Sequence, residues 1–392
     1  MRISEIEGFE LGVSATPGAA SWASTMILVK ITTSDGYVGY GEAVPTLRAL
    51  PVLEAIKEVA RVYKGKEVEN REENRKEWRK NDFYLSRSFE STTALSAIDI
   101  ACWDIVGKMH NAPVYELLGG AVRDRIKVYA NGWYDNCITP EQFAIRAKEI
   151  TGKGYKALKF DPFGHYFDYI DQSGLKMAEE RVRAVRDAVG IDVDLLIEHH
   201  GRFNANSAIS ISDALASCKP LFMEEPVHPE QFDGLRKYRK NSHLKVALGE
   251  RILTKEDADM FMSEDLVDFL QPDICNIGGF TEMKKVAAIA EMHGVELALH
   301  NAFGPVQNAA TIQVDAYIPN FLIQESFYDF FPQWKRDLIH DSTKVENGYY
   351  RIPKKAGLGI DIDEKLMKEY VIQGMESFDP AEPVWVVKGT WS

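Results

Sequence analysis

The chain has 392 residues, 45% hydrophobic and 27% charged, which is the balance of a globular protein of two or three domains. Its net charge of −13 argues against nucleic acid or anionic membranes as partners, although solubility alone also explains the charge. No C-x-x-C pair and no signal-like or membrane-length apolar run occurs, so we expect a cytoplasmic protein without structural disulfides.

Residues 1–122 are predicted to form an α+β capping domain. Ser4–Val13, Thr25–Thr33 and Tyr37–Glu42 alternate apolar and polar residues as half-buried strands do, and helical periodicity follows them. Between the first two strands lies a segment of small residues, 14–24, which contains Trp22. We expect this segment to be a mobile lid that brings Trp22 to the substrate.

Residues 123–345 are predicted to form a TIM-type (β/α) barrel, and 346–392 a tail that packs back on the cap. Eight short apolar runs alternate with amphipathic segments, and eight βα units fit the size of this barrel. A doubly wound sheet would have fewer strands and a glycine-rich first turn, which is missing here. The runs are Val128–Asn131, Ala157–Phe160, Leu195–Glu198, Leu221–Glu224, Val246–Gly249, Phe269–Gln271, Leu297–His300 and Leu322–Glu325.

Three glutamates end successive runs at 26-residue intervals: Glu198, Glu224 and Glu250. Equal spacing predicts that the carboxylates lie at one height at the C-terminal mouth of the barrel. Since three carboxylates repel one another, we expect a cation between them, and an all-oxygen site favours Mg²⁺, with Mn²⁺ as a substitute. Solvated rim residues are the alternative, but their recurrence in phase with the barrel repeat weakens it.

The next runs end in groups suited to acid–base chemistry. Asp273 and His300 lie one βα unit apart, as a carboxylate that orients an imidazole base would, although a structural histidine is the alternative. Glu325 ends the eighth run, and Lys159 and Asp161 end the second. We expect all five side chains to point into the same mouth.

A histidine pair follows the first glutamate. In an extended chain His200 would project to the same side as Glu198, whereas His199 would alternate away and be structural. Nucleophilic Ser/His/Asp chemistry has little support because no G-x-S-x-G elbow occurs.

These motifs resemble the enolase superfamily, in its mandelate racemase-like branch, over essentially the whole chain. The resemblance is carried by Ser96–Ile105, Leu117–Gly120, Met223–Pro226, Gly249–Arg251, Gln271–Asp273 and Asn276–Gly279. It implies that the three glutamates bind Mg²⁺, that His300 with Asp273 is the general base, and that Glu325 binds the carboxylate side of the substrate.

Two departures from the branch bear on the reaction. Glu198 stands where most relatives carry Asp, so the metal position is open. Asp161 stands where racemases and lactonising members have the second Lys of a Lys-x-Lys pair. A lysine base on the opposite face is therefore not expected, while Lys159 would neutralise the substrate carboxylate and Asp161 would contact the substrate.

His200, followed by Gly201-Arg202, resembles the galactonate dehydratase-type acid-sugar dehydratases, and the whole chain looks closest to archaeal members that act on D-gluconate. The implied reaction is Mg²⁺-dependent loss of water from D-gluconate, or also D-galactonate, to a 2-keto-3-deoxy acid, with His300 as base and His200 as acid. Such enzymes are commonly octameric homo-oligomers.

Other functions stay open at this point. The substrate could be xylonate, arabinonate or rhamnonate. The chain could also be a racemase, epimerase or lactonising enzyme of the same superfamily, or a non-catalytic barrel.

Overall fold

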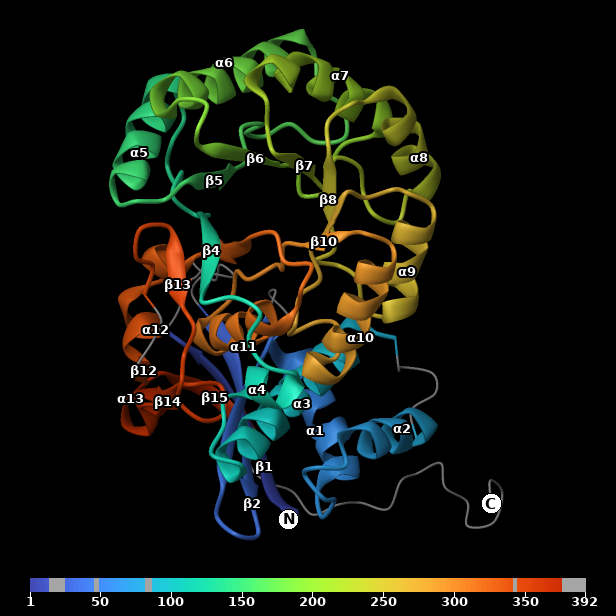
Figure 1. Ribbon diagram of the computed structural model, residues 1–392, viewed down its shortest axis with the longest axis vertical. Coiled ribbons are helices and arrows are strands. Elements are labelled where there is room, and N and C mark those ends of the chain that lie inside the picture. The colour runs from blue at the N-terminus through green and yellow to red at the C-terminus, as the bar shows by residue number, and fades with distance from the viewer. Residues whose placement is uncertain (14–24, 46–48, 82–86, 341–343, 376–392) are drawn as a thin grey trace.

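A computed structural model describes residues 1–13, 25–45, 49–81, 87–340 and 344–375. It contains a parallel (β/α) barrel and, beside it, a smaller α+β unit built mainly from the N-terminal residues (Figure 1). This arrangement confirms the predicted fold class. Trp22 and the expected lid, 14–24, lie outside the described residues.

The cap is an antiparallel sheet followed by helices. Its strands are β1 (Ile3–Gly12), β2 (Thr25–Thr33) and β3 (Val38–Ala43), ordered β15-β1-β2-β3. The helices are α1 (Ala49–Tyr63), α2 (Arg71–Asn81), α3 (Phe89–Met109) and α4 (Val114–Leu118). Strand β1 alternates buried and partly exposed residues, as predicted. Strands β2 and β3 are instead buried on both faces, because α3 and α1 cover one side of the sheet and the barrel side covers the other.

The barrel strands follow the predicted runs closely. They are β4 (Arg125–Ala130), β5 (Ala157–Phe160), β6 (Asp194–Glu198), β7 (Phe222–Glu224), β8 (Val246–Leu248), β9 (Phe269–Leu270), β10 (Glu296–Leu297) and β11 (Gln324–Ser326). Each pairs in parallel with its sequence neighbour from β4 to β10, and β11 lies beside β4. A parallel bridge between Leu297 and Phe321 spans the remaining gap.

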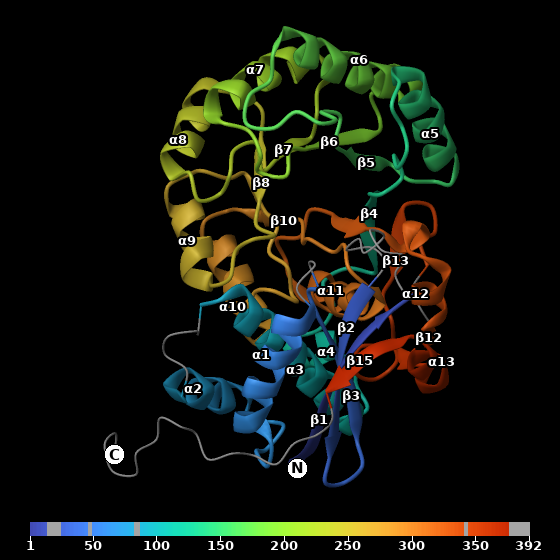
Figure 2. The same cartoon turned by 180° about the vertical axis from the view of Figure 1, so that it is seen from behind.

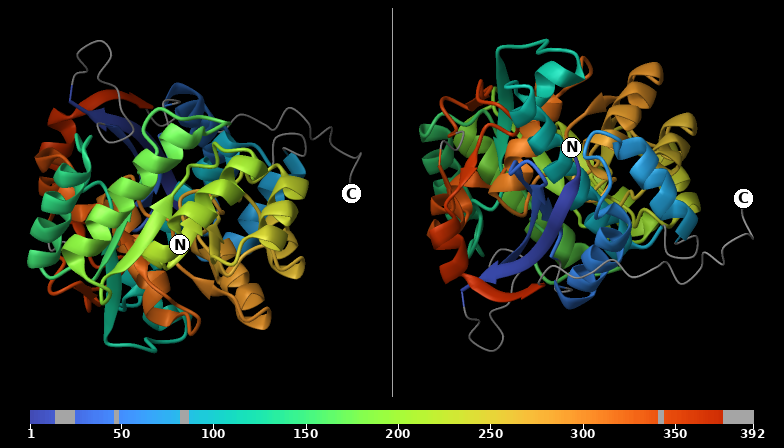
Figure 3. Two further views of the ribbon diagram at one scale, coloured as in Figure 1. Left: turned by 90° about the horizontal axis from the view of Figure 1, so that it is seen from above. Right: turned by 90° about the horizontal axis from the view of Figure 1, so that it is seen from below.

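Helices cover the outside of the curled sheet (Figure 3). Several begin where a polar side chain caps free backbone N–H groups: Thr139 and Gln142 form a capping box at the first barrel helix, and Asp171 caps the second. The helices are α5 (Pro140–Gly152), α6 (Gln172–Val189), α7 (Ala205–Leu215), η1 (Ala216–Cys218), α8 (Phe232–Asn241), α9 (Lys255–Ser263), α10 (Gly279–Met292) and α11 (Pro305–Tyr317). Within the described ranges, none of the helices is long and apolar enough to cross a membrane.

The C-terminal segment touches both units. β13 pairs with barrel strand β4, and β15 pairs antiparallel with β1 of the cap, so the chain returns to the cap sheet (Figure 2). As far as residue 375, this segment adds one strand to the cap sheet and one strand to the barrel. The elements that follow β11 are η2 (Tyr328–Phe330), α12 (Gln333–Asp337), β12 (Ile339–His340), β13 (Tyr349–Arg351), β14 (Asp361–Ile362), α13 (Glu364–Glu369) and β15 (Val371–Met375), of which the last four lie in the C-terminal segment.

Helix α3 joins the cap to the barrel. It is buried from Ser91 to Gly107 and contacts both β3 and α10. Asp99 accepts hydrogen bonds from the backbone N–H and the hydroxyl of Thr281 on α10, at 3.0 and 2.5 Å. The close approach of α3 to β3 requires glycine, because a Cβ on Gly41 would lie 1.9 Å from the carbonyl oxygen of Ala97.

We therefore predict that Gly41→Ala destabilises the protein by about 2 kcal/mol or more, because the helix backbone must move. Gly152→Ala is the control, since a Cβ there meets no atom within 4 Å, and it should change stability by less than about 1 kcal/mol. Urea unfolding at one fixed protein concentration measures both. Equal stability of the two variants would contradict the close packing of α3 on β3.

Candidate active site

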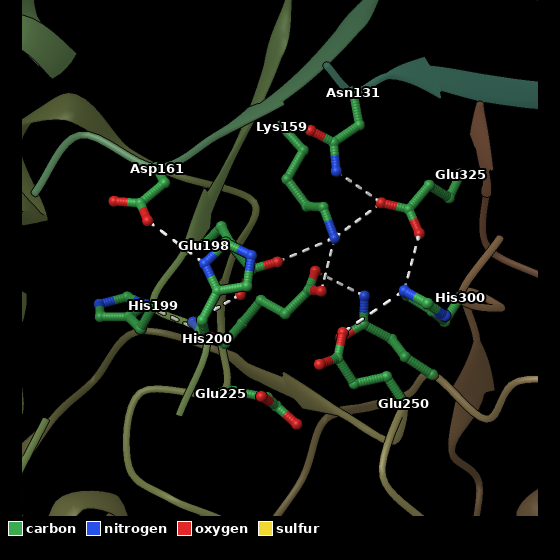
Figure 4. A network of polar contacts seen from close by, with 12 residues as sticks. Asn131, Lys159, Asp161, Glu198, His199, His200, Glu225, Glu250, His300 and Glu325 are labelled. Carbon is green, nitrogen blue, oxygen red and sulfur yellow. Dashed lines mark hydrogen bonds and ion pairs between the residues drawn. The ribbon is translucent and has the colours of Figure 1, made fainter. Parts of the chain in front are cut away.

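A buried lysine lies at the centre of the barrel mouth. The ammonium of Lys159, on β5, lies 3.0 Å from Glu198, 2.5 Å from Glu224 and 2.8 Å from Glu325. These carboxylates come from β6, β7 and β11, so one ammonium joins four strands of the barrel (Figure 4). Ion pairs hidden from solvent to this degree are held by geometry and by further hydrogen bonds.

Amide groups complete the shell around the carboxylates. Asn131 Nδ2 donates to Glu325 Oε1 at 2.7 Å, and the backbone N–H of Asn301 donates to its Oε2 at 2.9 Å. Gln271 Nε2 donates to Glu224 Oε2 at 2.7 Å. The carboxylates are therefore fixed in place by strands on both sides of the lysine.

The cluster carries more negative than positive charge. Burial and the charge of Glu198 raise the pKa of Glu224 well above its usual range, and the two carboxyl groups share a hydrogen bond. Burial also opposes ionisation of Glu198, but Lys159 and His200 outweigh it and hold the pKa of Glu198 well below its usual range. Carboxylates this close need a proton or a cation between them.

This donor set fits a hard divalent cation. Buried carboxylate oxygens with a surplus of negative charge are the ligands that Mg²⁺ and Mn²⁺ prefer. Nevertheless, the described residues contain no cluster of three or more His, Cys, Asp and Glu side chains gathered at metal-binding geometry. Glu198 and Glu224 are in contact, whereas the third glutamate of the predicted set is turned elsewhere.

Glu250 departs from the height that equal spacing predicts. Glu198 pairs in register with Glu224, but the register partner of Glu224 on β8 is Ala247, so Glu250 lies three residues further along. Its carboxylate is 3.5 Å from His300 Nε2 and 3.5 Å from Arg251 Nε. Equal sequence spacing did not give equal height, because register partners are 26 residues apart between β6 and β7 (224 − 198) but only 23 apart between β7 and β8 (247 − 224).

His300 and Asp273 form the predicted dyad. The imidazole Nδ1 lies 2.7 Å from Asp273 Oδ2, and Gln307 Nε2 donates to both oxygens of that carboxylate at 2.8 Å. Burial alone would lower the pKa of His300, but the hydrogen bond to Asp273 and the charges of Glu250 and Glu325 outweigh it and raise the pKa to about 9. The other ring nitrogen, Nε2, faces the carboxylates of Glu250 and Glu325, at 3.5 and 3.9 Å.

His200 reaches the mouth by a different route from the extended chain that we predicted. Its φ is 52°, in the left-handed region, and its backbone N–H donates to Glu198 Oε1 at 2.7 Å. The ring Nδ1 lies 3.2 Å from Asp161 Oδ2. Burial lowers the pKa of His200, but the charge of Glu198 and the hydrogen bond to Asp161 outweigh it and raise the pKa to about 9.

The residues around His200 bind to one another or to the backbone. Arg202 Nη2 donates to both oxygens of Asp161, at 2.6 and 2.5 Å, so this carboxylate is already engaged rather than free for substrate. His199 is fully buried, with Nδ1 3.0 Å from the carbonyl oxygen of Glu224 and its ring packed on Phe163. These contacts fit the structural role expected for His199.

Several polar residues of the site were missed from the sequence. Asn131 could have been found, because it ends the first barrel run as Glu325 ends the eighth. Gln307 and Glu42 carry no such signal, since they come from a helix start and from the cap. Glu42 is fully buried on β3 and accepts the backbone N–H groups of Val306 and Gln307 at the start of α11, at 3.1 and 2.9 Å. The cap is thereby joined to the helix that carries the partner of Asp273.

Comparison with known families defines the class of protein. Residues 142–366 match the enolase C-terminal domain-like family, and residues 15–119 match the N-terminal domain of mandelate racemase and muconate lactonizing enzyme. The chain therefore belongs to the enolase superfamily, in the mandelate racemase-like branch.

The chain is also similar to individual named proteins. The chain is 51% identical to the D-gluconate dehydratase of Thermoproteus tenax, over 99% of this chain and 78% of that protein. It is 49% identical to the D-gluconate/D-galactonate dehydratase of Picrophilus torridus, over 99% of both chains. The D-galactonate dehydratase of Ralstonia pickettii is 33% identical over 92% of this chain and 94% of that protein.

Solved structures share the whole fold. A member of the enolase superfamily from Salmonella Typhimurium superposes with a TM-score of 0.88 at 27% identity, covering 95% of this chain and 99% of that one. A mandelate racemase/muconate lactonizing enzyme-like protein from Roseovarius gives 0.88 at 32% identity, covering 96% and 97%.

The burial of Glu42 predicts a pH-dependent stability. Burial raises the pKa of Glu42 to about 7, against the donated N–H groups, which lower it. Between pH 4.5 and 7 the carboxyl group of Glu42 then keeps a proton in the folded state that it has lost in the unfolded state. Its contribution to the free energy of unfolding therefore falls as pH rises. Glu42→Gln should remove that fall, which is at most about 3 kcal/mol.

The measurement is the free energy of urea unfolding of both proteins at several pH values across that window. The stability difference, wild type minus Glu42→Gln, should decrease steadily from pH 4.5 to 7. A difference that stays constant with pH would contradict the protonated, buried Glu42.

Proposed function

We propose that this protein is a Mg²⁺-dependent sugar-acid dehydratase, a hydro-lyase that converts D-gluconate, and also D-galactonate, to the 2-keto-3-deoxy acid and water. The observation that carries the proposal is the placement of two histidines. His200 and His300 lie on either side of the Lys159-centred carboxylate cluster (Figure 4). The ring of His200 lies beside Asp161, and that of His300 lies beside Asp273. An elimination needs one acid and one base placed in this way.

The relatives support the same reaction. The proteins that match at 49–51% identity are named for D-gluconate and D-galactonate dehydration. The position of Asp161 argues against a racemase, because a second base is needed there and this carboxylate is paired with Arg202. Function is carried by these site residues, since the fold alone hosts several activities.

The chain's own residues account for each proton. His300 Nε2, oriented through Nδ1 by Asp273, removes the C2 proton of the sugar acid. Charge then develops on the substrate carboxylate, and the Lys159 ammonium would stabilise it. The charged imidazole of His200 gives a proton to the departing 3-hydroxyl, and a C2–C3 double bond forms as the C3–O bond breaks. The enol tautomerises to the keto acid.

A divalent cation completes this scheme. Glu198, Glu224 and Glu250 are the residues that would hold it, with Glu250 moving from its present position beside His300. When bound, the cation would supply positive charge to offset the negative charge that develops on the substrate. With Glu250 bound to the cation, the imidazole of His300 would lose a neighbouring negative charge, which favours the neutral ring that a base requires.

Three finer points are part of the same proposal. We infer that the protein works in the cytoplasm as a homo-oligomer, and an octamer is one such assembly. We also infer that the cap, the barrel and the C-terminal segment meet near residues 122 and 345. Glu325 would face the substrate carboxylate, since it borders both Lys159 and His300.

A keto-acid assay across sugar acids tests the reaction and its substrate. With Mg²⁺ we expect D-gluconate to give the highest kcat/KM, followed by D-galactonate, with xylonate, arabinonate and rhamnonate as comparisons. EDTA should lower the rate about a hundredfold or more, and added Mg²⁺ or Mn²⁺ should restore it. Full activity in EDTA would refute the metal role, and strict preference for another sugar acid would change the substrate alone.

Separate histidine variants test the two roles. His300→Asn should lose both dehydration and deuterium exchange at C2. His200→Asn should lose dehydration by about 100-fold or more while exchange persists. His293→Asn is the matched control, because its ring also contacts an aspartate, Asp259 at 2.9 Å, but away from the site.

The readouts are keto-acid formation and NMR of substrate recovered from D₂O. Undiminished dehydration by His200→Asn would remove that residue from the acid role. Exchange that persists in His300→Asn would show that another group is the base.

A further inference from the structure

The backbone at His200 is strained and held from several sides. A left-handed φ in a residue other than glycine costs about 1 kcal/mol and persists only where the surroundings impose it. The N–H of His200 is held by Glu198 at 2.7 Å, and its carbonyl oxygen accepts from Arg251 Nη2 at 2.7 Å. The next residue, Gly201, donates its N–H to the carbonyl oxygen of Glu225 at 3.1 Å.

Arg251 links the ends of three barrel strands. It follows β8, and its Nη2 contacts both the His200 carbonyl after β6 and the carboxylate of Glu225 after β7, the latter at 3.0 Å. Glu225 is fully buried, and apart from this ion pair neither of its carboxylate oxygens has a hydrogen-bond partner in the described parts of the chain. Because a buried carboxylate is costly without a partner, the contact with Arg251 holds the carboxylate and the guanidinium together.

The glycine after His200 makes room for this guanidinium. A Cβ on Gly201 would lie 2.9 Å from Arg251 Nη1 and 3.2 Å from Glu225 Oε2. The arginine therefore lies directly against the turn that carries His200. Glu225 and Arg251 contact the backbone of this turn, whereas Asp161 contacts the ring.

We propose that Arg251, anchored by the buried Glu225, is a positioning residue that fixes the His200 turn and so directs the reaction to loss of water rather than return of the C2 proton. This inference rests on the proposed dehydratase function. Arg251 acts through His200 and transfers no proton itself.

The test is the Arg251→Met variant assayed with D-gluconate in D₂O. Mg²⁺ is kept at saturation, so that any weaker binding of the cation by Glu250, which Arg251 also contacts, does not limit the rate. Dehydration should fall about tenfold or more, because the acid is misplaced, while deuterium exchange at C2 persists. The ratio of exchanged substrate to keto acid should therefore rise. A purely structural loss would lower both rates together.

Arg239→Met is the matched control, because Arg239 also pairs with a carboxylate, Asp268 at 2.6 Å, and with a backbone carbonyl, that of Asp265 at 3.1 Å. It should leave the ratio unchanged. Arg251→Lys keeps a positive charge beside the buried Glu225, so this variant should fold even if Arg251→Met does not. It should raise the ratio of exchanged substrate to keto acid less than Arg251→Met does. An unchanged ratio in both Arg251 variants would overturn the proposal.

A crystal structure of Arg251→Met separates this inference from the proposed function. If the wild-type protein turns over no sugar acid, the dehydratase proposal fails, yet the positioning claim is still tested. Displacement of the His200 ring from Asp161 would support it. An unmoved left-handed His200 would overturn it.

Discussion

The buried ammonium of Lys159 is the interaction on which the rest of the site depends. It neutralises part of the charge of three carboxylates that come from three different strands. Without it, Glu198, Glu224 and Glu325 could not lie together in a water-poor barrel mouth. The remaining surplus of negative charge makes the mouth receptive to a divalent cation and to the protonated form of nearby histidines.

Two chains of hydrogen-bonded residues, one containing His300 and the other His200, lie on either side of this centre. On one side His300, Asp273 and Gln307 continue to Glu42, so the orientation of the base depends on a residue of the cap. On the other side His200 lies between Asp161, which contacts its ring, and Arg251, which contacts its backbone. The two imidazoles differ in their surroundings. The ring of His300 faces the carboxylate cluster, whereas the side chain of His200 is half exposed to solvent.

The cap and the barrel are joined by direct contacts. Helix α3 packs against both, with its carboxylate at Asp99 bound to α10, and β15 returns the chain to the cap sheet. Relatives that share the whole fold at 27–32% identity bear several different descriptions. The barrel supplies strand ends at a common edge, and the residues placed there decide the reaction.

The sequence by itself determined the barrel, the cap, and the residues that end each strand, because the βα repeat and the alternation of apolar residues are local properties. It also determined the pairing of His300 with Asp273, since adjacent strands bring their ends together. Only the tertiary structure decided that Lys159 occupies the centre, that Glu250 lies beyond the height of Glu224, and that His200 is left-handed. Those outcomes depend on where strands stop and turn, and on contacts such as Glu42 with α11 that join residues more than 250 positions apart.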